Sequence, residues 1–120
     1  NAGHVPPLLL GKDGKLASLP PCGPAIGIIP DADFSVREIS MDVDDLWLAY
    51  TDGIPDALDA ENASFGDERL LEIVRKGDAA PAELLKKIKE QLFQFIGVAD
   101  QFDDVTMVAA KRISPPNSNG

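Results

Sequence analysis

The stretch LWLAYTDG occupies residues 46–53 and decides the fold. Its first six residues form a continuous apolar run ending in threonine, which predicts a strand over residues 46–51 that is buried on both faces. Asp52-Gly53 then ends the run, because an Asp-Gly pair is a strong turn signal. The rest of the chain is read outward from this strand.

Before the strand, the chain has the pattern of short β-segments separated by turns. Residues 5–10 and 15–19 flank Asp13-Gly14 and are expected to form a hairpin. Residues 25–29 are a small apolar segment closed by Pro30. Residues 34–39 alternate apolar and polar side chains, which predicts a strand with one exposed face.

After the strand, the period of the pattern becomes helical. We expect a helix over residues 65–76, with Ser64 as its N-cap and Gly77 as its stop. A second helix is expected over residues 81–96, since apolar residues recur there every three or four positions. Pro81 suits its first turn and Gly97 its C-terminal cap. A last strand is expected over 105–110, so strands and helices fall in separate runs and the fold class is α+β.

Composition excludes several function classes. The chain has 120 residues, with 20 Asp and Glu against 11 Lys and Arg, which gives a formal net charge of −9. Such a surface repels phosphate backbones and anionic lipids, so we expect no nucleic-acid partner and no membrane insertion. The single cysteine, Cys22, fits a reducing compartment. Residues 42–61 hold seven acidic residues and no basic one, which is either a rim that attracts cations or a solvated loop.

Acidic residues follow one predicted strand and precede another. Asp52 ends the strand over 46–51, and Asp103-Asp104 lies at the entry to the last strand. If these strands are antiparallel neighbours, the carboxylates meet at one edge of the sheet, where oxygen ligands suit Mg²⁺ or Mn²⁺. The alternative for both positions is an ordinary turn or strand-entry role.

Four motifs occur in order along the chain: NAGHVPPL at residues 1–8, YTDGI at 50–54, FGDERL at 65–70 and QFDDVT at 101–106. With this order and spacing, the chain resembles the bacterial PPM/PP2C-type serine phosphatases, in the branch of the sporulation and stress-response sigma-regulator phosphatases. The resemblance covers residues 1–113, and we expect residues 114–120 to be a disordered tail. One departure is Asp44-Asp45, where the family usually has Gly-Asp before the buried strand.

The resemblance implies an α-β-β-α arrangement, a PP2C-like β-sandwich flanked by helices, of which this chain supplies the C-terminal half. It implies a protein serine/threonine phosphatase, a hydrolase that uses two Mn²⁺ or Mg²⁺ ions to activate water. By the same resemblance the metal ligands are Asp52, Asp103 and Asp104, with Gly53 and His4 near the site. No catalytic residue beyond these ligands is implied. His4 is either a weak metal ligand or a histidine hydrogen-bonded to the backbone.

The family's first metal-binding motif lies upstream of residue 1, so we expect this fragment to be inactive alone. The resemblance implies a cytoplasmic signalling protein with an upstream sensor or receiver module. Its substrate would be a phosphorylated regulatory protein such as an anti-sigma-factor antagonist. The alternative is a non-catalytic PP2C-like interaction module. A half-domain exposes apolar surface, so self-association into a homo-oligomer is a further expectation.

Overall fold

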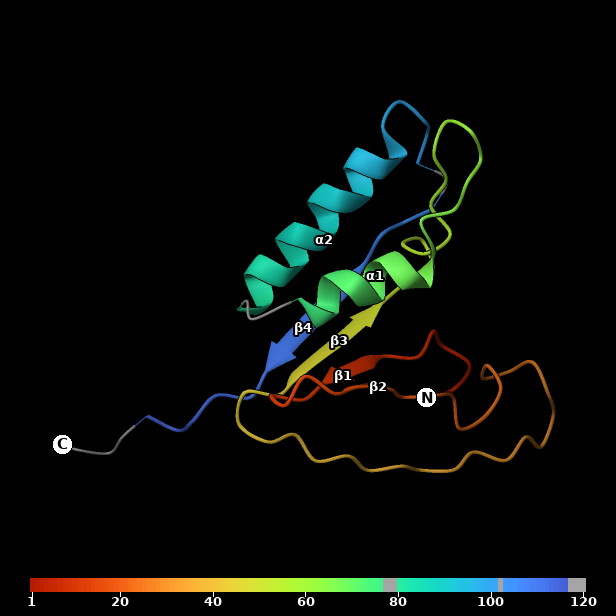
Figure 1. Cartoon of the computed structure of the whole chain (residues 1–120). Coiled ribbons are helices and arrows are strands. Elements are labelled where there is room, and N and C mark those ends of the chain that lie inside the picture. Colours follow the sequence, from red (N-terminus) through yellow and green to blue (C-terminus); the bar gives the residue numbers. More distant parts are fainter. Residues whose placement is uncertain (77–79, 102, 117–120) are drawn as a thin grey trace.

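The computed structural model describes residues 1–76, 80–101 and 103–116, and within them it contains one sheet and two helices (Figure 1). The strands pair antiparallel in the order β2-β1-β3-β4. The predicted α+β class is confirmed. In chain order the elements are β1 (Leu8–Leu10), β2 (Leu16–Ser18), β3 (Leu46–Tyr50), α1 (Gly66–Arg75), α2 (Pro81–Ile96) and β4 (Met107–Lys111).

Both helices lie on the same side of the sheet, where they form the core with one face of the strands (Figure 1). In β3 the side chains of Leu46, Leu48 and Tyr50 are buried on this face. The helices contribute the apolar stripe that their 3.6-residue period predicts. Its buried members are Leu70, Ile73, Val74, Leu84, Ile88, Leu92 and Ile96. The core therefore lies between the two helices and one face of the sheet.

Burial of β3 on both faces was a wrong prediction. Trp47 and Ala49 alternate with the buried residues and are partly exposed. They lie on the face of the sheet that the helices do not cover. An apolar run predicts burial on both faces, but within the described residues only one face is covered by helices.

Two segments in the loop between β2 and β3 also differ from expectation. Residues 34–39 form no strand, and residues 25–29 lie in a turn region. Their alternation is typical of a strand, but a strand also needs a pairing partner, and the described residues supply none. Ile26, Ile28 and Val36 are instead highly exposed.

The helix boundaries agree closely with the sequence pattern, with one exception. Helix α2 begins at Pro81 and is capped by Gly97 at a φ of 58°, as predicted. Helix α1 has Phe65 as its N-cap with no side-chain hydrogen bond, so the prediction of Ser64 was wrong. Ser64 instead forms an isolated β-bridge with Leu58.

Two predictions concern residues that the structure describes only in part. The predicted stop at Gly77 lies outside the described residues. Residues 114–116 belong to no helix or strand, and the rest of the expected tail lies outside the described residues. No helix in the described ranges is long and apolar enough to span a bilayer.

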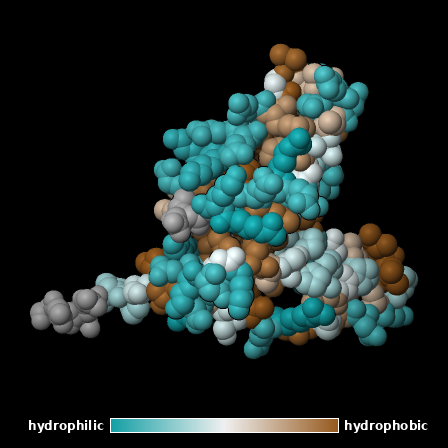
Figure 2. Space-filling view, viewed as in Figure 1, coloured by the Kyte–Doolittle hydropathy of each residue, from teal (hydrophilic) through white to brown (hydrophobic). Residues whose placement is uncertain are grey.

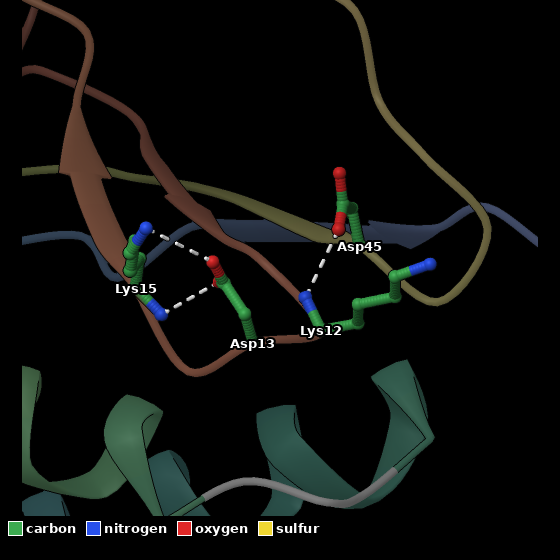
Figure 3. Close-up of polar contacts among 4 residues, drawn as sticks. All are labelled: Lys12, Asp13, Lys15 and Asp45. Carbon is green, nitrogen blue, oxygen red and sulfur yellow. Dashed lines mark hydrogen bonds and ion pairs between the residues drawn. The ribbon is translucent and has the colours of Figure 1, made fainter.

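Asp45 connects the β1–β2 turn to the start of β3 (Figure 3). One carboxylate oxygen accepts a hydrogen bond from the Lys12 backbone N–H at 3.0 Å, and the other accepts from the Asp42 N–H at 2.7 Å. Asp45 is 8% exposed, and among the described residues it is the charged residue that is buried. Its two bonds satisfy a carboxylate that would otherwise be costly to bury.

Asp44 stands at the position where the resemblance leads us to expect glycine, and its backbone conformation is one that favours glycine. Its φ is 74°, in the left-handed region that favours glycine and that aspartate tolerates better than most residues. Its backbone N–H donates to the Arg112 carbonyl at 2.8 Å, so the strained residue holds β3 in register with the end of β4.

Candidate metal centre

The end of β3 and the approach to β4 are joined directly. The Thr51 N–H donates to the Thr106 carbonyl at 3.1 Å, continuing the ladder beyond the Tyr50–Met107 pair. The Thr51 hydroxyl donates to the Asp104 carbonyl at 3.2 Å and accepts from the Thr106 N–H at 3.1 Å. Antiparallel pairing thus brings the segment after β3 beside the segment before β4.

Gly53 lies against the backbone of the Asp103–Asp104 pair. It is buried, and a Cβ on it would overlap the Asp104 carbonyl oxygen and lie 3.1 Å from the carbonyl carbon. The same Cβ would lie 3.6 Å from the Cβ of Asp103. Its φ is not in the left-handed region, so space, and not conformational freedom, requires glycine here.

The predicted ligands Asp52, Asp103 and Asp104 lie at this edge of the sheet with exposed side chains. Two hydrogen bonds hold Asp103, one at its side chain and one at its backbone. Its Oδ1 accepts from the Asp104 N–H at 2.7 Å, and its carbonyl accepts from Gln101 Nε2 at 2.7 Å. The edge therefore presents carboxylates on a backbone ordered by local hydrogen bonds.

A cavity of about 240 Å³ opens beside Gly53 and Asp103. Asp56 and Asp100 also line it, and Ala57, Leu58 and Ile96 form its apolar wall. Asp56 comes from the acid-rich stretch 42–61. Asp100 was missed, because it lies just before the motif at residues 101–106 and no pattern in the sequence singles it out.

These donors fit the chemistry of a hard divalent ion, because carboxylate oxygens are the ligands that Mg²⁺ and Mn²⁺ prefer. The lack of a Cβ on Gly53 lets the Asp104 backbone lie directly against the turn after β3. The number of these carboxylates falls short of a full ligand set. Within the described ranges, no group of three or more His, Cys, Asp or Glu side chains is arranged to hold a metal ion.

His4 makes local backbone contacts. Its Nδ1 lies 2.8 Å from the Val5 carbonyl oxygen, and its backbone N–H donates to Asn1 Oδ1 at 2.8 Å. Its side chain is exposed and does not line the cavity beside Gly53. These contacts favour the backbone-bonded alternative for His4.

Comparison with known proteins gives the same family. The model of the family Stage II sporulation protein E (SpoIIE) matches residues 1–113. The chain is 37% identical over 112 residues to Protein IcfG of Synechocystis, covering 93% of this chain and 18% of that protein.

Two solved structures share the fold. The SiaA-PP2C domain of Pseudomonas aeruginosa has a TM-score of 0.75 at 21% identity, over 92% of this chain and 44% of that one. The SpoIIE phosphatase domain of Bacillus subtilis, presoaked with Mn, has a TM-score of 0.68 at 16% identity, over 95% of this chain and 49% of that one. The chain thus spans less than half of these relatives, and it belongs to the SpoIIE family with the PP2C-type phosphatase fold.

Proposed function

We propose that the chain is the C-terminal part of a metal-dependent protein serine/threonine phosphatase domain. One observation carries the proposal: pairing of β3 with β4 puts Asp52-Gly53 against Asp103-Asp104, with Gly53 in contact with the Asp104 backbone. This is the juxtaposition that a shared site for divalent cations needs.

Each residue of this edge has a proposed role. Asp52 and Asp103 would hold the ions, Asp104 would add a carboxylate, and Gly53 leaves the space for the Asp104 backbone beside the turn after β3. The Thr51 hydroxyl holds the Asp104 carbonyl in place by its hydrogen bond of 3.2 Å. When bound, Mn²⁺ or Mg²⁺ supplies a water of lowered pKa and neutralises charge that develops on the phosphoryl oxygens.

Electrostatics support a role for cations here. The chain carries a net charge of −9, Asp56, Asp100 and Asp103 line the cavity beside Gly53, and Asp52 and Asp104 are the sequence neighbours of Gly53 and Asp103. Unneutralised carboxylates repel a phosphate ester, and cations held by these residues would reduce that repulsion.

We propose a phosphoserine or phosphothreonine regulatory protein as the substrate, such as an anti-sigma-factor antagonist. Family membership supports this choice. We further propose a cytoplasmic location and an upstream sensor or receiver module in the parent polypeptide. The 120-residue chain alone should be inactive, because among its described residues no group of three or more His, Cys, Asp or Glu side chains is arranged to hold even one ion.

The test is Mn²⁺-dependent hydrolysis of an aryl phosphate. It compares the 120-residue chain with the same chain joined to the preceding part of its parent's phosphatase domain. We expect turnover only in the longer protein, and its loss in Asp52→Asn. Asp42→Asn is the matched control, because it removes the same charge at the opposite end of β3 and should keep activity.

A second candidate is a non-catalytic interaction module with the same fold. The observation that favours it is that the exposed carboxylates form no arranged group of three within the described residues. Absence of turnover in the longer protein, with Mn²⁺ and with Mg²⁺, would favour this candidate over the phosphatase.

A further inference from the structure

The loop over residues 51–65, between β3 and α1, carries two carboxylates of the candidate metal centre, Asp52 and Asp56. Backbone hydrogen bonds fold this loop back on itself. The Asp56 N–H donates to the Asp52 carbonyl at 3.0 Å, and the Phe65 N–H donates to the Ala57 carbonyl at 2.8 Å. The two ends of the loop are therefore linked, and the position of its carboxylates depends on what holds Phe65.

Phe65 is held by Arg69, which lies one turn further along α1. Nη1 of Arg69 donates to the Ser64 carbonyl at 3.0 Å and to the Phe65 carbonyl at 3.1 Å. Its guanidinium carbon also lies 4.4 Å from the centroid of the Phe95 ring, in α2. That ring meets the Phe65 ring edge to face, with centroids 5.4 Å apart and an angle of 74° between the planes. One side chain thus ties the loop to both helices.

This aromatic cluster adjoins the cavity beside Gly53. Ala57, which accepts the Phe65 hydrogen bond, and Ile96, which follows Phe95 in α2, both form the cavity wall. Figure 1 shows the loop between β3 and α1 beside the C-terminal end of α2. Phe65 is 3% exposed, so a buried ring anchors the loop at this junction.

The shape of the Arg69 side chain suits this position. A planar guanidinium can lie flat on an aromatic ring and still donate hydrogen bonds in its own plane, whereas a lysine ammonium is a point charge on a flexible stem. The other side chains that line the hollow around it are uncharged: Phe65, Gln91, Gln94 and Phe95. Figure 2 shows a mostly hydrophilic surface over the two helices, so the guanidinium lies at a solvated junction. Stacking and carbonyl bonding therefore explain its placement.

We propose that Arg69 is a positioning residue for the metal centre. It does not line the cavity beside Gly53, and it acts by fixing the loop whose carboxylates would hold the ions. The inference rests on the proposed function, because it takes this edge of the sheet as the metal site. Coulomb's law alone predicts the opposite effect: a positive charge near a cation site opposes metal binding, so its removal would strengthen that binding.

The test titrates the 120-residue chain with Mn²⁺ and records the concentration that halves the amide signals of residues 52–54. Arg69→Met should require about three- to tenfold more Mn²⁺ than the parent chain, because the ligand-bearing loop loses its support. Arg69→Lys keeps the charge and should also require more, since geometry is what it loses. Arg75→Met is the matched control, because it removes the same charge from the last turn of the same helix, and it should require no more Mn²⁺ than the parent.

Hydrogen exchange without metal gives a second readout. The Asp56 and Phe65 amides, which bond within the loop, should exchange at least about threefold faster in Arg69→Met than in the parent chain. The Leu48 amide, in the middle of β3, should keep its rate. This contrast separates local loosening of the loop from a general loss of stability.

The outcomes separate this inference from the proposed function. Mn²⁺ binding that is unchanged or stronger in both Arg69 variants would overturn the inference and leave the phosphatase proposal standing. Unchanged exchange at Asp56 and Phe65, or equal acceleration at Leu48, would also overturn it. A parent chain whose signals at residues 52–54 broaden no earlier than those at 42–45 would contradict the metal site itself, and both proposals with it.

Discussion

Gly53→Ala tests the close approach on which the candidate site depends. The added Cβ would overlap the Asp104 carbonyl oxygen and lie 3.1 Å from the carbonyl carbon, both of which are backbone atoms. Overpacking of a buried position costs about 1–3 kcal/mol, and the loss of glycine entropy in the unfolded chain returns about 0.4–1 kcal/mol. We therefore expect the free energy of unfolding to fall by about 1–2 kcal/mol. For a chain of this length the Tm should fall by roughly 4–8 °C.

The assay is urea and thermal denaturation followed by circular dichroism, with Gly11→Ala as the control. Neither glycine has a positive φ, so both substitutions probe space alone. At Gly11 the new Cβ would meet a side-chain oxygen of Asp13 at 2.6 Å, and that flexible side chain can move away. Gly11→Ala should stay within about 0.5 kcal/mol of the parent. Equal stability of Gly53→Ala and the parent chain would refute the direct contact between the turn after β3 and the Asp104 backbone.

Three further predictions concern the residues around β3. Asp45→Ala should lower the free energy of unfolding, measured in urea, by about 2–4 kcal/mol, because two backbone N–H groups lose a charged acceptor. Asp45→Asn should lower the same free energy by roughly half as much. Thr51→Val should cost about 1–2 kcal/mol by the same measurement, whereas Thr51→Ser should restore most of it, since serine keeps the hydroxyl that bonds the Asp104 carbonyl. Burial, and then the Asp67 carboxylate, raise the pKa of Tyr50 above 10.0, so the folded chain binds the proton more tightly than the unfolded chain. Stability should therefore fall as the pH rises above about 10, and a Tm series against pH should be flatter in that range for Tyr50→Phe.

Local signals predicted the helices well, and non-local pairing limited the rest. Pro81, Gly97 and the apolar period between them specify α2 within one segment of sequence, so its bounds were predicted correctly. The alternation of residues 34–39 is equally clear, but a strand requires a pairing partner, and among the described residues this segment has none. The two-sided burial expected of β3 was wrong for the same reason, because Trp47 and Ala49 face the uncovered side of the sheet.

The candidate site was likewise predicted only in part. The position of Asp52 after one strand and of Asp103 before another, combined with antiparallel pairing, predicted that they share an edge of the sheet. That Asp56 and Asp100 also line the cavity at this edge was not predicted, because no pattern in the sequence places either side chain there. The steric role of Gly53 likewise becomes visible only with the Asp104 backbone in place.

The most direct test of the central claim is to locate bound Mn²⁺ on the chain by nuclear magnetic resonance. Substoichiometric Mn²⁺ broadens the backbone amide signals nearest to it, even when binding is weak. We predict that signals of residues 52–54 and 103–105 broaden first, ahead of those of residues 42–45 in the same acid-rich part of the sequence, and that Asp52→Asn removes this preference. Broadening that is centred elsewhere, or that is equal over all acidic segments, would contradict the assignment of this edge as the metal site.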